Sequence, residues 1–150
     1  METSDRAPGD EAGPLDSFLA LMDAAWAVAA SLVRDRAFGH LTPSQFAVLA
    51  ALRHDGSLSQ TGLAGRIGKS TGNLVTIINN LQKQGLVIRA RLKTDRRVVN
   101  VILTEKGRQV VEELIPRHAL AIARAMSVLP ESEQGELRRL CRSLSLHSSR

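Results

Sequence analysis

The sequence predicts a mainly α (α+β) fold, in which helices surround one short β-hairpin. Two observations predict it. Between Leu86 and Gly107, side chains alternate in character along two short runs, which is the period of half-buried strands. Over most of the remaining chain, apolar residues recur at helical spacing between residues that begin and end helices. At 150 residues, 43% of them hydrophobic, the chain suffices for one domain or for two small lobes that share a core.

The hairpin has a basic tip. Its first arm places Leu86, Ile88, Ala90 and Leu92 on one face and Val87, Arg89 and Arg91 on the other. The return arm alternates Val99, Val101 and Leu103 with Val98, Asn100 and Ile102. From Arg89 to Arg97 the segment carries five basic side chains and one acidic one. Such like charges repel one another on a bare surface, so the tip predicts a polyanionic partner.

Capping residues define the helices. Thr42, Pro43 and Gln45 form a capping box with proline at the first helical position, and Ser59, Ser70 and Thr104 can each begin a helix. The predicted helices run from 15 to about 37, from 42 to about 54, over 60–67, from 70 to about 84, from 104 to about 128, and from 130 onward. A short strand is expected at 57–59. This order of elements predicts a winged helix-turn-helix domain over 41–104.

The outer helices form the rest of the predicted architecture. Residues 15–40 and 105–150 are too apolar for a winged domain of this size to cover, so we expect them to form a helical dimerisation lobe, with a second copy of the chain as partner. Residues 1–14 contain two prolines and two glycines and few apolar side chains, which predicts a disordered acidic arm. The net charge of the whole chain is +5. Residues 1–16 carry a net charge of −4, so the remaining 134 residues carry a net charge of +9.

Several classes of protein are disfavoured because the sequence lacks the motifs that they need. The N-terminus lacks the pattern of a signal peptide, and the most apolar window, Phe18–Val33, is 16 residues long, contains Asp23 and is short for a membrane span. A single cysteine, Cys141, excludes an internal disulfide, and a cytoplasmic location is expected. No phosphate loop, nucleophile elbow or metal-binding helix is present, and the four histidines lack metal-ligand spacing. We therefore expect no enzyme activity, no metal and no cofactor.

Three segments resemble the MarR family of bacterial regulators. Asp95–Gly107 resembles the family's wing signature, in which an Asp and an Arg precede a strand that ends in Leu-Thr, with a Gly three residues later. Segment 81–87 is similar to the end of its recognition helix, and segment 41–49 to its second helix. The resemblance covers roughly residues 15–147. It implies a homodimeric transcription factor with a recognition helix in the major groove and a wing in the minor groove of a pseudo-palindromic operator. Members are often repressors released by small phenolic or aromatic carboxylate ligands, or by oxidation of a cysteine.

Candidate DNA-binding residues follow from these elements. The fourth predicted helix presents polar side chains that suit base edges or phosphates, and the third opens with two more. The candidates on these helices are Gln60, Thr61, Lys69, Ser70, Thr71, Asn73 and Thr76. In the wing they are Lys93, Asp95, Arg96 and Arg97. The resemblance implies that Asp95 holds the wing arginine and that Arg97 enters the minor groove.

A small-molecule effector would bind where the two lobes meet. Trp26, His40 and Arg117 are the distinctive side chains expected near that junction, and they would suit an aromatic carboxylate. Cys141 lies in an apolar stripe, where a buried thiol behaves as a small hydrophobe. Two other functions stay open: a winged-helix protein-interaction module, and a non-specific nucleic-acid-binding protein.

Overall fold

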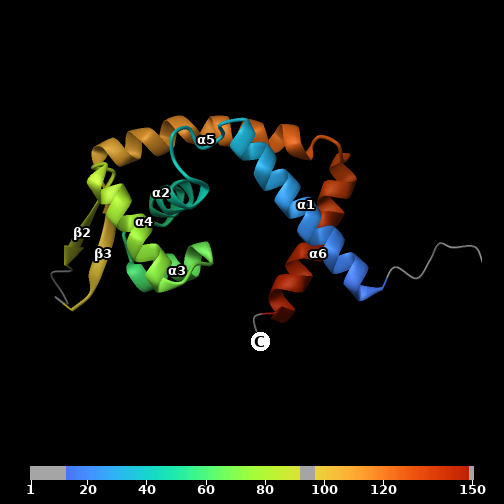
Figure 1. Ribbon diagram of the computed structural model, residues 1–150, viewed down its shortest axis with the longest axis horizontal. Coiled ribbons are helices and arrows are strands. Elements are labelled where there is room, and N and C mark those ends of the chain that lie inside the picture. Colours follow the sequence, from blue (N-terminus) through green and yellow to red (C-terminus); the bar gives the residue numbers. More distant parts are fainter. Residues whose placement is uncertain (1–12, 92–96, 149–150) are drawn as a thin grey trace, which may run out of the picture.

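A computed structural model describes residues 13–91 and 97–148 of the chain. In order, the elements are α1 (Pro14–Arg34), α2 (Pro43–Asp55), β1 (Leu58–Ser59), α3 (Gln60–Ile67), α4 (Thr71–Lys83), β2 (Val87–Arg91), β3 (Val99–Leu103), α5 (Glu105–Met126) and α6 (Glu131–Ser148). The long helix α5 joins two groups of elements, with α2, α3, α4 and the sheet at one end and α1 and α6 at the other (Figure 1). This is the predicted mainly helical fold with a winged helix-turn-helix. Most of the predicted arm, residues 1–12, lies outside the described residues.

The predicted caps begin the helices of the winged domain. Thr42 and Gln45 form the reciprocal capping box of α2, with Pro43 at the first helical position. The hydroxyls of Ser59, Ser70 and Thr104 each accept a hydrogen bond from a backbone N–H in the first turn of the helix that follows. A side-chain oxygen that satisfies an otherwise unpaired N–H contributes about 1 kcal/mol at such a position, so these ends are well determined by local sequence.

The sheet is antiparallel, with strand order β1-β3-β2. Arg89 of β2 lies opposite Val101 of β3. Val87 and Val101 are fully buried, whereas Ile88 is 48% exposed. The buried side of the hairpin is therefore the face that carries Arg89, and not the uniformly apolar face of Ile88. The packing of helices against the sheet decided this.

One continuous core lies inside the winged domain and under α5. Leu49, Leu63, Leu74, Ile78 and Leu81 are completely buried there. The helix α5 contributes Val111, Leu114 and Ala121 to the same core, while α1 contributes only Leu32 from its end. No residue of α6 between Glu131 and His147 is buried. The outer helices thus gain little of their cover from the described part of their own chain.

The helix α1 is longer than its apolar window suggests. It has 21 residues, and by length and composition alone it is long and apolar enough to cross a membrane. The estimate from the 16-residue window between Phe18 and Val33 was wrong on this point, because the helix extends beyond the window at its N-terminal end. Its apolar side chains are largely exposed, with Trp26 64% and Phe18 55% accessible. Such a face requires cover of some kind.

Candidate nucleic-acid interface

The recognition helix α4 separates an apolar face from a polar one. Leu74, Ile78 and Leu81 are buried in the core. Thr71, Asn73 and Thr76 are exposed, so the three predicted DNA-binding side chains of this helix lie at the surface. Ser70 is also exposed, and its hydroxyl accepts a hydrogen bond from the Asn73 backbone N–H at 3.3 Å. Ser70 therefore shapes the start of the helix, whatever else it contacts.

Lys69, Asn73 and Thr76 line a common groove beside α4. The groove has a volume of about 460 Å³, and its other wall comes from the N-terminal end of α2. Its lining residues are Thr42, Ser44, Gln45, Lys69, Asn73, Thr76, Ile77 and Asn80. The structure thus brings together three of the predicted DNA-binding residues, next to further hydroxyl and amide groups. Groups of this kind bond to phosphates and base edges.

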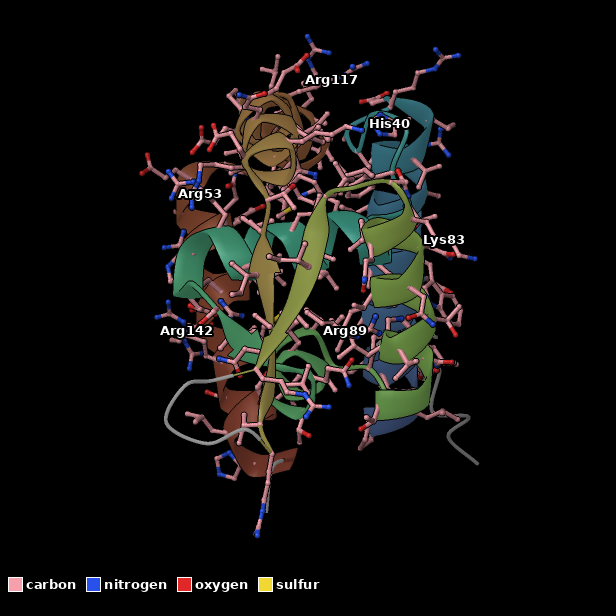
Figure 2. All side chains as sticks on the ribbon, turned by 90° about the vertical axis from the view of Figure 1, so that its left-hand side faces the viewer. His40, Arg53, Lys83, Arg89, Arg117 and Arg142 are labelled. Atoms are coloured by element: carbon pink, nitrogen blue, oxygen red, sulfur yellow. The ribbon has the colours of Figure 1, made fainter. Side chains whose placement is uncertain are left out.

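The start of α3 meets the wing. Thr61 is exposed, whereas Gln60 is half-buried and its amide oxygen accepts a hydrogen bond from Arg89 Nε at 2.9 Å. Arg89 also donates to Gln82 Oε1 at 2.7 Å and to Asn79 Oδ1 at 2.8 Å. In Figure 2, Arg89 lies between β2 and α4. The sequence showed Arg89 only as one charge of the wing. The signal that could have identified it is its pair of apolar neighbours on the same face of the hairpin: Val87, two residues earlier on β2, and Val101, opposite it on β3.

The wing tip is only partly within the described residues. Lys93, Asp95 and Arg96 lie outside them, so the pairing of Asp95 with a wing arginine stays a prediction. Arg97 is described and exposed, close to the start of β3. Its position at the end of a two-stranded projection suits insertion into a DNA groove.

The base of the wing is closely packed. The Thr104 hydroxyl donates to the carbonyl oxygen of Gly85 at 2.6 Å, and the Thr104 backbone N–H donates to the Leu86 carbonyl oxygen at 3.1 Å. A Cβ on Gly107 would overlap the Leu86 carbonyl oxygen. The Thr and Gly of the wing signature therefore have structural roles, since Thr104 bonds to the turn that follows α4 and the missing side chain of Gly107 lets α5 begin against that turn.

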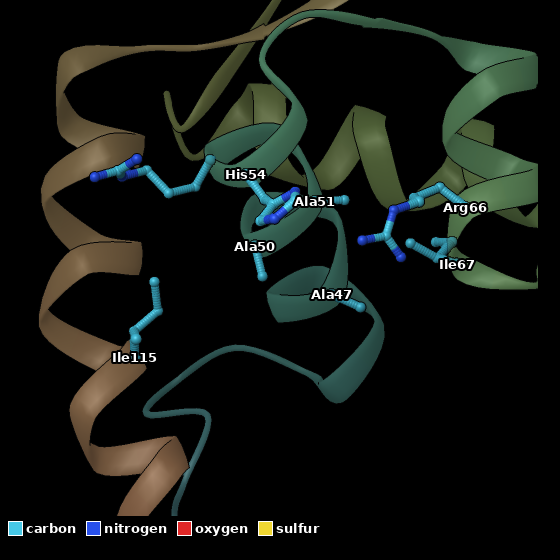
Figure 3. Close-up of a pocket in the computed structure, with 8 residues that line it drawn as sticks. Ala47, Ala50, Ala51, His54, Arg66, Ile67 and Ile115 are labelled. Atoms are coloured by element: carbon cyan, nitrogen blue, oxygen red, sulfur yellow. The ribbon is translucent and has the colours of Figure 1, made fainter. Parts of the chain in front are cut away.

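A separate cavity of about 640 Å³ opens between α2, α3 and α5 (Figure 3). Three alanines of α2 form its floor, and Ile115 of α5 faces Ile67 of α3 across them. Its full lining is Ala47, Ala50, Ala51, Arg53, His54, Arg66, Ile67 and Ile115. The predicted ligand residues lie elsewhere: Trp26, His40 and Arg117 are all exposed, and none of them lines this cavity.

Ion pairs cross the rim of this cavity. Arg53 pairs with Glu112 of α5 at 2.7 Å, and Arg66 pairs with Asp55 at 2.9 Å. Hydrogen bonds from His54 and Arg66 lower the pKa of the Asp55 carboxyl below its usual value of 3.8. These pairs are solvent-exposed, so water screens them and each adds little to the stability of the fold. They place two guanidinium groups, each paired with a carboxylate, at the edge of the apolar floor.

The described residues also include several histidines and one cysteine. Within residues 13–91 and 97–148, no group of three or more His, Cys, Asp or Glu side chains could hold a metal ion. Cys141 of α6 is a half-buried thiol.

Comparisons with known proteins agree with this geometry. The model of the MarR family matches residues 41–99. YkoM of Bacillus subtilis, an uncharacterised transcriptional regulator of the helix-turn-helix type, is 34% identical over 116 residues, covering 77% of this chain and 75% of YkoM. The transcriptional repressor MdtR of the same organism is 32% identical over 93 residues, covering 62% of this chain and 60% of MdtR.

Comparison with solved structures also finds regulators of transcription. BpsR of Bordetella bronchiseptica, whose DNA binding is regulated by 6-hydroxynicotinic acid, superposes with a TM-score of 0.80 at 26% identity, covering 93% of this chain and 98% of BpsR. The fold and the recognition helix define a winged-helix regulator of transcription, and not an enzyme. The chain belongs to the MarR family.

Proposed function

We propose that the chain acts as a homodimeric repressor that binds a pseudo-palindromic operator. One observation carries the dimer: α1 and α6 present apolar side chains that no described part of the chain covers. On α6, Leu140 is 46% and Leu144 55% exposed, and on α1 Trp26 is 64% exposed. An obligate interface of about 2,000 Å² or more would bury them. In this proposal α1 is covered by a partner subunit and not by lipid, and the protein works in the cytoplasm.

The dimer divides each chain into two functional parts. Residues 41–104 form the DNA-binding domain, and residues 15–40 and 105–150 form the dimerisation lobe. A two-fold axis through that lobe would place two α4 helices about 34 Å apart, one turn of DNA. Relatedness to the repressor MdtR supports repression as the sign of regulation.

Specific contacts are assigned by position. Asn73 and Thr76 would read base edges, since Asn can pair bidentately with adenine. Lys69, Ser70, Thr71, Gln60 and Thr61 would hold phosphates of the same groove. Arg97 would enter the minor groove, with Lys93, Asp95 and Arg96 around it. The net charge of +9 outside residues 1–16 supplies the long-range attraction.

Two measurements test this function. Sedimentation at micromolar concentration should give a dimer, and a monomer would refute the two half-site arrangement. Footprinting on DNA that flanks the gene should show a symmetric protected site. Equal affinity for random and flanking duplexes would instead indicate a non-specific nucleic-acid-binding protein, and no DNA binding at all would indicate a protein-interaction module.

An anionic aromatic effector is a second part of the proposal. The cavity between α2, α3 and α5 has the volume of a small-molecule site, an apolar floor of Ala47, Ala50 and Ala51, and cationic groups at its rim. The ligand-regulated DNA binding of BpsR supports it. A ligand would release DNA by binding better to a conformation with the wrong spacing of recognition helices.

Titration with salicylate-like compounds tests the effector. A compound that binds should raise the melting temperature and lower operator affinity, and Ala50→Leu should weaken its binding by filling the floor. Trp26, His40 and Arg117 stay a predicted contact set for the same ligand in the dimer. Ligand binding that is lost in Trp26→Ala and kept in Ala50→Leu would place the effector at that junction.

A further inference from the structure

Arg89 connects three elements of the DNA-binding domain. Its guanidinium, on β2, donates to amide oxygens of Gln60 on α3 and of Asn79 and Gln82 on α4, at 2.9, 2.8 and 2.7 Å. The side chain lies on the inward face of the hairpin, between β2 and α4 (Figure 2). Among the described residues, no carboxylate lies within ion-pair distance of it, and the hydrogen-bond acceptors that face its guanidinium are these neutral amide oxygens.

The chemistry of this cluster determines which way the amides face. A guanidinium only donates hydrogen bonds, so each amide must offer its oxygen to Arg89 and turn its NH₂ group away. Asn79 and Gln82 are exposed, and with Lys83 and Arg89 they line a polar groove of about 440 Å³ between α4 and the wing. Arg89 therefore fixes the amides as donors on the side of the molecule that carries the recognition helix.

The same hydrogen bonds fix the position of α4 relative to the wing. Asn79 and Gln82 belong to the second half of α4, and Arg89 belongs to the strand that leads to the wing tip. A planar, forked group that bonds to both elements at once resists their relative rotation better than a lysine, whose ammonium is a compact point charge on a flexible stem. Reading a major and a minor groove together requires that α4 and the wing keep one relative orientation.

We propose that Arg89 is a positioning residue for operator recognition, which ties the recognition helix to the wing through the amides of Gln60, Asn79 and Gln82. This inference rests on the proposed DNA-binding function. It predicts that Arg89 acts on specificity, the ratio of affinity for operator to affinity for random DNA, more than on general attraction to DNA. Its charge matters less than its shape.

Arg89→Lys tests this directly, because it keeps the charge and removes the fork. Affinities for the footprinted operator and for a random duplex of equal length are measured by fluorescence anisotropy at several salt concentrations, together with melting temperatures. The operator-to-random ratio should fall by about tenfold or more, on the scale of one specific base contact. The salt slope should stay unchanged, because no charge is lost. The matched control is Arg139→Lys on α6, where Arg139 makes a bidentate pair with Glu136, and it should leave the ratio unchanged.

Gln82→Met provides a second variant if Arg89→Lys fails to fold. It removes one acceptor of the cluster and should lower the ratio by a smaller factor. The double variant should lose little more than Arg89→Lys alone, because both changes break one network. A ratio that stays within about twofold of the original protein in both variants would overturn the proposal.

Two other outcomes separate the possible failures. In the first, Arg89→Ala loses affinity equally for operator and random DNA and its salt slope falls by about one unit, while Arg89→Lys keeps the affinities of the original protein. That result would make Arg89 a phosphate contact and overturn its positioning role. If the original protein binds operator and random duplexes equally, the proposed function itself fails. These two results are distinguishable because the second needs no variant.

Discussion

Replacing Gly107 by alanine should destabilise the protein, although the position lies in the first turn of a helix. A Cβ there would overlap the carbonyl oxygen of Leu86, a backbone atom that cannot move alone. Separation of α5 from the turn after α4 would weaken the hydrogen bonds from Thr104 to Gly85 and Leu86. Overpacking costs about 1–3 kcal/mol, and each weakened hydrogen bond about 1 kcal/mol, against a gain of about 1 kcal/mol in helix propensity. We expect a net loss of about 2–4 kcal/mol.

Thermal unfolding followed by circular dichroism measures this loss. For a chain of this size, about 2–4 kcal/mol corresponds to a melting temperature lower by roughly 4–16 °C, provided that protein concentration is held constant. Gly135→Ala is the matched control, because a Cβ at that position of α6 would meet no atom within 4 Å. It should raise stability by up to about 1 kcal/mol. If Gly107→Ala is as stable as the original protein while Gly135→Ala behaves as expected, the steric reasoning is refuted.

Three further predictions concern DNA binding, the pH dependence of stability, and dimer formation. Arg97→Ala should weaken binding to all DNA and lower the salt slope of the affinity by about one unit. Asn73→Ala should instead lose about 1–3 kcal/mol of discrimination at one base pair. If both variants lose affinity equally for operator and random duplexes, α4 is not the recognition helix. Burial lowers the pKa of His118 below 6.5, so the unfolded chain binds the proton first, and the free energy of unfolding should fall as pH drops from 6.5 through the folded-state pKa. His118→Phe should remove that dependence in pH-resolved denaturant titrations, and an unchanged profile would exclude His118 as its cause. Leu144→Glu should shift the protein to a monomer in sedimentation, while Arg142→Glu on the same helix should leave the dimer intact.

Local sequence determined the elements of this fold. The capping box at Thr42 and the caps at Ser59, Ser70 and Thr104 each act through hydrogen bonds within a few residues, so they could be predicted one helix at a time. The same holds for the polar edge of α4, because helical periodicity alone separates Asn73 and Thr76 from Leu74 and Ile78. The wing signature, which is a short stretch of sequence, indicated the family by itself.

Only the tertiary structure decided which face of the hairpin is buried. Alternation places Ile88 and Arg89 on opposite faces, and hydrophobicity alone favours burial of Ile88. The structure buries Val87 and Val101 instead, because α3 and α4 pack on that side and offer three amide oxygens to the arginine between them. The cavity between α2, α3 and α5 was missed for a related reason, since α5, which contributes Ile115 to its lining, is distant in the sequence from α2 and α3. A single side chain's role depends on what other elements bring to it, and periodicity carries no information about that.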